Sequence, residues 1–190
     1  MTLILFNKPF GVMSQFSPHP ARATLSDFLD IPGIYPAGRL DADSEGLMLL
    51  TDDGALQHAI SHPDSGKEKT YLVQVEGIAS QEQLNRLQQP LDLGDFITRG
   101  SKTVRIEEPG WLWPRTPPIR QRREQPTSWL AMTLSEGKNR QVRRMTAAIG
   151  LPTLRLVRSA IGPLSLATQP LLPGEWRELG IEAWQSTEGT

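Results

Sequence analysis

Short apolar runs bounded by turn residues recur along this chain and predict strands. Residues 46–51 (GLMLLT) end at the turn Asp52-Asp53-Gly54, which is the pattern of a buried strand. Residues 70–75 alternate instead, so that Tyr71, Val73 and Val75 share one face. The complete set of predicted strands is 3–6, 46–51, 70–75, 129–134 and 154–157.

Helical spacing is confined to a few short segments. Ser80-Gln81-Glu82-Gln83 has the form of a capping box at the start of one of them. Val142, Met145 and Ile149 fall at the i, i+3 and i+7 positions of another, which carries the clearest helical pattern in the chain. The predicted helices are 24–29, 55–60, 81–88 and 138–149.

Residues 108–127 show neither the alternation of a strand nor the spacing of a helix. They contain five prolines, two tryptophans and four arginines. We expect a long loop or an extended arm, because prolines at this density interrupt both helices and central strands. The two tryptophans argue against simple disorder.

The order of these elements indicates the fold class. Predicted strands occur in neighbouring groups rather than in strict alternation with helices, which favours an α+β fold with a mixed, mainly antiparallel sheet and short flanking helices. The length of 190 residues suits one domain or two small lobes sharing a core, and we expect a single domain over 1–190. There is no GxGxxG or Walker A pattern, so nothing supports a nucleotide cofactor.

Composition excludes several further classes. No apolar stretch approaches the roughly 20 residues that span a bilayer, and the N-terminal MTLILFNKPFG lacks the basic region of a signal peptide. We therefore expect a soluble, cytoplasmic protein. The absence of cysteine excludes disulfides, cysteine-bound zinc and a thiol nucleophile. His58 and His62 are four residues apart, but Pro63 follows directly, and we interpret them as a surface pair rather than a metal site.

The net charge of −1 conceals two unlike regions. Residues 115–158 hold ten basic and two acidic residues, a net charge of +8, and the remainder holds ten basic and nineteen acidic residues, a net charge of −9. Nine of the ten basic residues are arginines, which bind phosphate with a planar fork and stack on bases. Trp111, Trp113 and Trp129 add stacking surface, so this region predicts a nucleic-acid face, with RNA favoured over duplex DNA. The alternative is a solvated helix and a solvated loop.

Residues 38–47 (GRLDADSEGL) form the densest candidate for chemistry. They place an arginine, three carboxylates and a hydroxyl between two glycines, directly before a predicted buried strand. Loops at strand ends commonly carry catalytic groups. From composition alone, a polar turn would be the favoured interpretation of this segment.

The motifs in this chain resemble those of the pseudouridine synthases, in particular the RsuA-type enzymes that modify ribosomal RNA. The resemblance covers essentially the whole chain, and its most specific parts are GRLD and QVRRM. The matching segments, in order, are Lys8-Pro9-Phe10-Gly11, the GRLDADSEGLMLLTDDG segment 38–54, Lys69-Thr70-Tyr71, the EGKNRQVRRM segment 136–145, Leu156-Val157-Arg158, Ile161-Gly162-Pro163-Leu164 and Pro173-Gly174-Glu175-Trp176-Arg177.

This resemblance implies the pseudouridine synthase catalytic fold with a central cleft, and isomerisation of a uridine in RNA to pseudouridine without cofactor or metal. It makes Asp41 the catalytic carboxylate, acting at either the base or the sugar. Arg143 becomes the cation that pairs with it, and Tyr71 the ring that stacks on the uracil. Leu156 corresponds to an apolar position under the base, and ordinary core packing explains it nearly as well.

The remaining family positions imply substrate binding. We expect Arg39 to contact RNA phosphate or to brace the loop, and Arg140 and Arg144 to contact backbone phosphate. Lys8 is expected to stabilise the site loop through the KPxG turn. Lys69 and Arg158 belong to the same set because they lie in the KxY and LVR segments. Asp43 and Ser44 are interpreted as loop-shaping residues.

The expected partner is ribosomal RNA, 23S by resemblance, and the expected state is a monomer. Many relatives carry an N-terminal S4 RNA-binding module, and we expect none here because the KPxG motif begins near residue 8. One alternative is a non-catalytic RNA-binding or ribosome-assembly factor on the same fold. A carboxylate glycosidase ranks last, because it would leave the arginine-rich region unexplained.

Overall fold

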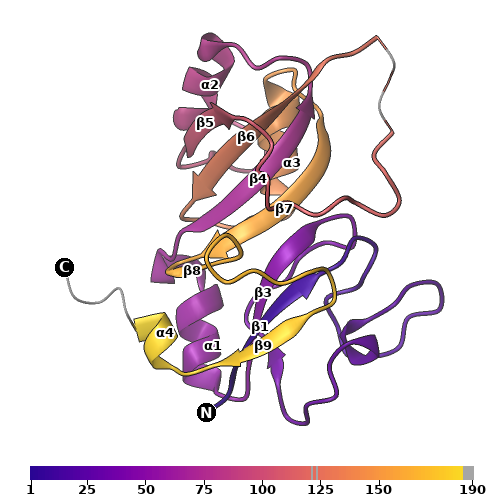
Figure 1. Cartoon of the computed structure of the whole chain (residues 1–190). Coiled ribbons are helices and arrows are strands. Elements are labelled where there is room, and N and C mark those ends of the chain that lie inside the picture. Colours follow the sequence, from indigo (N-terminus) through magenta and orange to yellow (C-terminus); the bar gives the residue numbers. More distant parts are fainter. Residues whose placement is uncertain (121, 123, 186–190) are drawn as a thin grey trace. The chain divides into compact units, whose positions relative to one another are not determined.

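A computed structural model of the chain, shown in Figure 1, describes residues 1–120, 122 and 124–185. The chain divides into two compact units. The first contains Met1–Lys67 and Arg158–Thr190, and the second contains Glu68–Val157. That the two units work as one catalytic domain stays a prediction.

The first unit is built on antiparallel strands in the order β3-β1-β9. Strand β1 (Leu3–Lys8) lies between β3 (Glu45–Thr51) and β9 (Trp176–Leu179), and every residue of β1 and β3 is buried. The remaining elements of this unit are η1 (Leu25–Asp27), β2 (Tyr35–Pro36), α1 (Gly54–Ser61), η2 (Pro63–Ser65), β8 (Leu164–Ser165) and α4 (Glu182–Gln185). An apolar cluster, which includes Phe6, Leu25, Leu40 and Met48, fastens the long connection after β1 to these strands.

The second unit has antiparallel strands in the order β5-β6-β4. Its elements are β4 (Lys69–Glu76), α2 (Gln81–Gln88), β5 (Lys102–Ile106), β6 (Thr127–Leu134) and α3 (Gln141–Ala148). Strand β7 (Thr153–Ile161) begins in this unit and ends in the first. Side chains from α2, α3 and alternate positions of the strands form its core.

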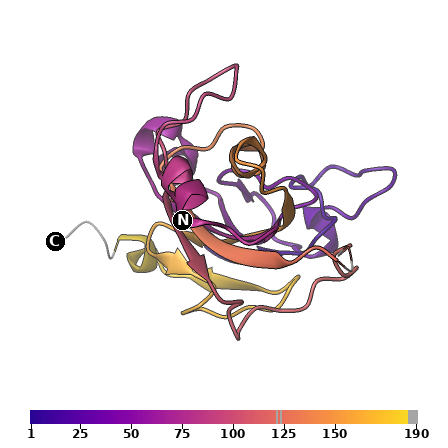
Figure 2. The ribbon, with the colours of Figure 1, turned by 90° about the horizontal axis from the view of Figure 1, so that it is seen from above.

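The strands of the second unit have two differently covered faces. The core side chains Val73, Leu130 and Met132 pack with those of α2 and α3 on one face. Because side chains alternate across a strand, Trp129 and Arg155 lie on the other face, next to Leu130 and Leu156 of the core face. The loop between β5 and β6 runs along that second face, and Figure 2 shows it and α3 on opposite sides of β6.

Most predicted elements are confirmed. The α+β class with mainly antiparallel strands is correct, and an isolated parallel bridge joins Met13 to Thr24. The five predicted strands correspond to β1, β3, β4, β6 and β7, and 107–126 form a long loop without helix or strand in its described part. The capping box at Ser80 is present as predicted.

Two helix predictions were wrong in extent. Residues 24–29 form only the 3₁₀ turn η1, which ends at Phe28, because the Phe28 backbone with φ of −121° lies outside the helical region. Helix α3 begins at Gln141 instead of residue 138, since Arg140 adopts a left-handed backbone with φ of 51° that no helix can include. Within the described residues, no helix has the length and apolarity to cross a membrane.

Candidate active site

Asp41 lies at an exposed turn between β2 and β3. Its carbonyl oxygen accepts a hydrogen bond from the Ser44 N–H at 3.0 Å, which closes residues 41–44 as a turn. The neighbouring Leu40 and Ser44 are buried, whereas Asp41 and Arg39 are exposed. The loop therefore presents a carboxylate to solvent from a backbone that is held inside the unit.

Ser14 holds this loop by a two-way contact with Leu40. The buried Ser14 Oγ donates to the Leu40 carbonyl at 2.6 Å and accepts from the Leu40 N–H at 3.1 Å. Both backbone polar groups of the residue before Asp41 are thus satisfied by one side chain. A lone serine in a loop has no spacing signal, and the sequence did not identify Ser14 as a site residue.

The KPxG turn holds the other side of Asp41. The Gly11 N–H donates to the Ala42 carbonyl at 2.7 Å, and the same carbonyl lies 3.5 Å from Lys8 Nζ. Lys8 Nζ also donates to the carbonyls of Pro9 at 2.9 Å and Val12 at 2.8 Å. These bonds agree with the expectation that Lys8 stabilises the site loop.

Lys8 has an unusual electrostatic position, because it is fully buried beneath an acidic loop. Burial lowers the pKa of its ammonium group to about 7. The carboxylates of Glu45, Asp43 and Asp41 act in the opposite direction, and the Arg158 guanidinium lowers the pKa further. The carboxylates of residues 41–45, which we call the carboxylate turn, therefore interact electrostatically with Lys8.

Arg158 is buried rather than exposed to RNA, at 3% exposure. Its Nε donates to the Leu47 carbonyl at 2.9 Å, and its Nη2 is buried without an acceptor among the described residues. The Arg158 backbone also explains Gly46, which has φ of +108° and whose added Cβ would lie 2.3 Å from the Arg158 carbonyl oxygen. Glycine is therefore required where the site loop enters β3.

Tyr71 and Leu156 belong to the second unit, where Leu156 is part of the core cluster and Tyr71 packs against that cluster. Tyr71 is partly buried and packs against the cluster that contains Val73, Val75 and Leu156, so the predicted strand face is confirmed. Leu156 is 6% exposed in this cluster, which fits core packing as well as contact with a base. Lys69 begins β4 and is partly exposed.

Glu136 and Gln141 fix the start of α3, which carries the remaining arginines. The buried Glu136 Oε1 accepts from Gln141 Nε2 at 2.7 Å and from the Arg99 N–H at 2.8 Å. Gln141 Oε1 accepts in turn from the Lys138 N–H at 3.0 Å. This network shapes the turn before the helix and explains why the EGxxxQ pattern needs a carboxylate and an amide five residues apart.

The three arginines of the α3 segment are in different environments. Arg140 is exposed at the left-handed N-cap, and Arg143 is partly buried on the first turns of the helix. The Arg144 guanidinium pairs with Asp95, donates to the Leu93 carbonyl at 2.8 Å and lies 5.1 Å from the Phe96 ring centroid. This pairing lowers the pKa of Asp95 and raises that of Arg144, in both cases mainly through the side-chain hydrogen bond.

The basic region is less exposed than its charge suggests. Arg155 is 4% exposed, and Trp113 and Trp129 are each 7% exposed. The prediction that the strand arginines and all three tryptophans contribute to an RNA face was therefore wrong. The sequence shows where charge accumulates along the chain, but burial depends on packing against residues distant in sequence.

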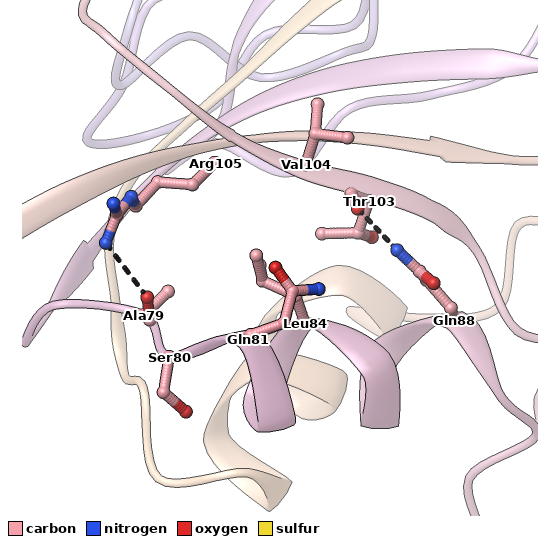
Figure 3. Close-up of a pocket in the computed structure, with 8 residues that line it drawn as sticks. All are labelled: Ala79, Ser80, Gln81, Leu84, Gln88, Thr103, Val104 and Arg105. Atoms are coloured by element: carbon pink, nitrogen blue, oxygen red, sulfur yellow. Dashed lines mark hydrogen bonds between the residues drawn. The ribbon is translucent and has the colours of Figure 1, made fainter.

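A groove runs between α2 and the edge strand β5 (Figure 3). Gln88 Nε2 donates to the Thr103 carbonyl at 2.8 Å, and Arg105 Nη1 donates to the Ala79 carbonyl at 3.2 Å, as the dashed lines mark. These bonds join the helix to an edge strand whose backbone would otherwise be open to pairing with another chain. None of the predicted site residues lines this groove.

The predicted site residues divide between the two units. Lys8, Arg39, Asp41 and Arg158 belong to the first unit, and Lys69, Tyr71, Arg140, Arg143, Arg144 and Leu156 belong to the second. The structure brings Lys8, Asp41 and Arg158 together electrostatically, and it places Tyr71 against the core cluster that contains Leu156. In the described ranges, no group of three or more acidic, histidine or cysteine side chains could hold a metal ion.

Comparisons with known proteins agree on one family. The model of the family described as RNA pseudouridylate synthase matches residues 2–148. A Vibrio vulnificus (strain CMCP6) protein named ribosomal large subunit pseudouridine synthase E is 51% identical over 179 residues, which cover 94% of this chain and 75% of that protein. A protein of the same name from Xanthomonas campestris pv. campestris is 54% identical over 177 residues, which cover 92% and 94%.

A solved structure supports the same relationship. The chain described as a crystal structure of pseudouridylate synthase matches with a TM-score of 0.79 and 30% sequence identity. The match covers 97% of this chain and 72% of that one. The similarity in sequence and in structure thus extends over nearly all of the residues.

Proposed function

This chain belongs to the RNA pseudouridylate synthase family, and we propose that it isomerises a uridine of 23S ribosomal RNA in the cytoplasm. As a pseudouridine synthase it is an isomerase. The names of relatives about half identical to it support large-subunit RNA as the substrate.

The reaction requires a group that can open and remake a glycosidic bond. The N-glycosidic bond of the uridine breaks, the uracil turns, and a carbon–carbon bond forms to the same ribose, so no atom is gained or lost. A carboxylate can act covalently in such a sequence, at the base or at the sugar, and so divide one difficult step into two. Asp41 is the proposed carboxylate, and the observation that carries this assignment is its exposed position on a loop fixed by Ser14, Gly11 and Lys8.

Tyr71 and Arg143 complete the proposed catalytic set. A uridine must leave its stack to reach a side chain in a folded protein, which costs a few kcal/mol. Stacking on the partly buried ring of Tyr71 would offset part of this cost. Arg143 is the proposed cation that pairs with Asp41 and fixes its orientation.

The other residues are proposed to bind or support. Arg39 and Arg140 are exposed and suited to phosphate contact, as is Lys69 at the start of β4. Arg144 would have to exchange Asp95 for a phosphate to do the same. Lys8 and Arg158 are buried, so their proposed contribution is to hold the loop and strand that carry Asp41.

A matched pair of variants tests this function. Purified wild-type protein should form pseudouridine at one position of a large-subunit RNA transcript, and Asp41→Asn should abolish the product while leaving RNA affinity nearly unchanged. Asp43→Asn removes a carboxylate from the same turn and should keep most of the activity. Substantial turnover by Asp41→Asn would exclude the assignment of Asp41, and absence of product with wild-type protein would exclude the proposed function on that RNA.

A further inference from the structure

The loop between β5 and β6, which we call the arm (residues 107–126), carries one exposed tryptophan. Trp113 is 7% exposed, whereas Trp111 is 38% exposed. The two ring centroids lie 6.4 Å apart with planes tilted by 50°. The buried Trp113 ring therefore lies next to the Trp111 ring, and part of the Trp111 ring is exposed at the surface.

The arm is held in place at this point by two arginines. The buried Arg155 donates from Nη2 to the Trp113 carbonyl at 2.8 Å, and its guanidinium lies 6.0 Å from the Trp113 ring centroid. Arg115 Nε donates to the Pro117 carbonyl at 2.7 Å, and its Nη1 lies 3.5 Å from the Leu154 carbonyl. The arm is therefore anchored at Trp113 and Arg115, and the Leu112 N–H donates to the Pro109 carbonyl at 3.0 Å across the turn that carries Trp111. Anchoring beside Trp111 without a ligand reduces the ordering cost of a contact made there.

Trp111 and Tyr71 lie on different faces of the second unit's strands. Tyr71 and Leu156 lie with α2 and α3 on the core face. Arg155 precedes Leu156 in β7 and so faces the opposite side, where Trp113 rests on it. A base that stacks on Tyr71 therefore cannot be the base that stacks on Trp111.

From this arrangement we propose that Trp111 is the stacking site for a second unpaired base of the RNA substrate, distinct from the uridine that is isomerised. An exposed indole is a stacking platform that accepts any base, because every base has an aromatic face. The arm holds four arginines and three glutamates, and Arg120 and Arg122 are exposed on it, with Arg122 Nη1 3.9 Å from Glu76 Oε1. These two arginines supply positive charge for the adjoining phosphates. This site rests on the proposed action on RNA and specifies where a further nucleotide binds.

The primary test compares two exposed tryptophans. Trp111→Ala should raise the Kd for large-subunit RNA fragments roughly 5- to 100-fold, the usual range for loss of one stacked base. The slope of log Kd against log salt should not change, because the indole makes no phosphate contact. Trp111→Phe should restore most of the affinity, and Trp176→Ala, which alters a comparably exposed ring of the first unit at 42% exposure, should leave it unchanged.

A second readout reports the contact directly. RNA containing 5-bromouridine should photocrosslink to the tryptic peptide that carries Trp111, and an RNA trimmed to the target stem should bind wild-type protein as weakly as full-length RNA binds Trp111→Ala.

The Trp111 stacking site and the isomerase activity can be overturned by different results. Wild-type affinity for Trp111→Ala, or crosslinks confined to other peptides, would overturn the stacking site while the isomerase assignment stands if product still forms. Absence of product from wild-type protein would overturn the proposed function, whatever the affinity of Trp111→Ala.

Discussion

At the scale of single residues, the candidate site depends on side chains that do no chemistry. Asp41 lies between Leu40, whose backbone is bound by Ser14, and Ala42, whose carbonyl is bound by Gly11 and Lys8. The motif identified Asp41 and Lys8, because both lie in recognisable patterns. Ser14 could not be found in this way, since its role depends on a contact between residues 26 apart in sequence.

Removal of the Ser14 hydroxyl tests whether Ser14 positions Asp41 in addition to stabilising the fold. Ser14→Ala leaves the Leu40 N–H and carbonyl buried without their partner, which should lower the free energy of unfolding by about 1–3 kcal/mol. Because a small displacement of a catalytic group is costly, kcat should fall about 10- to 100-fold with little change in KM. Steady-state kinetics well below the melting temperature measures this, with the exposed Ser17→Ala as control. Equal kcat values for Ser14→Ala and wild type would show that the loop is positioned without Ser14.

Lys8 gives the molecule a defined dependence of stability on pH. Its pKa is about 7 in the folded protein, against an ordinary value of 10.5 in an unfolded chain. Between these values the unfolded chain binds more protons than the folded protein, so the contribution of Lys8 to the free energy of unfolding rises with pH. Below about pH 7 the amine is charged in both states, and the cost of burying the charge is at its full value.

The pH effect is measured against a variant without the amine. From pH 7 to 10, wild type should gain stability relative to Lys8→Met by up to about 1.4 kcal/mol per pH unit in denaturant titrations. The exposed Lys102→Met should show no such trend against wild type. A constant difference between wild type and Lys8→Met over this range would show that the ammonium titrates normally in the folded protein.

At the scale of elements, the sequence predicted buried segments better than edges. Strands β1, β3, β4 and β6 were found because their apolar residues form continuous or alternating runs. Edge strands β5 and β9 were missed, since exposed and charged residues such as Lys102, Arg105 and Arg177 obscure the alternation. The start of α3 was misplaced because the helical pattern continues into a turn held by Glu136 and Gln141.

The turn before α3 offers a test at this scale. Gln141→Ala removes the bonds to Glu136 and to the Lys138 N–H, which should lower the free energy of unfolding by about 1–3 kcal/mol. Activity should fall further than stability explains, because Arg140 and Arg143 lie on the turn and helix that this network fixes. Gln81→Ala, at an exposed position on the first turn of α2, is the matched control for stability and activity. Wild-type stability and turnover for Gln141→Ala would show that the network is dispensable.

At the scale of the whole molecule, the opposing charges follow the division into units. The basic segment 115–158 lies almost entirely in the second unit, and the carboxylate turn at Asp41 belongs to the first. The sequence predicted this uneven distribution. It could not show that Arg155 and Arg158 are buried, so that the exposed charge is concentrated at the arm and at the turn before α3.

We propose that this chain isomerises one uridine of large-subunit ribosomal RNA through Asp41. The most direct measurement is nucleotide-resolution mapping of pseudouridine in ribosomal RNA from cells that lack the protein and are complemented with wild type or Asp41→Asn. One 23S position should be modified with wild type and remain uridine with Asp41→Asn or with no protein. Identical pseudouridine maps in all three strains would contradict the account.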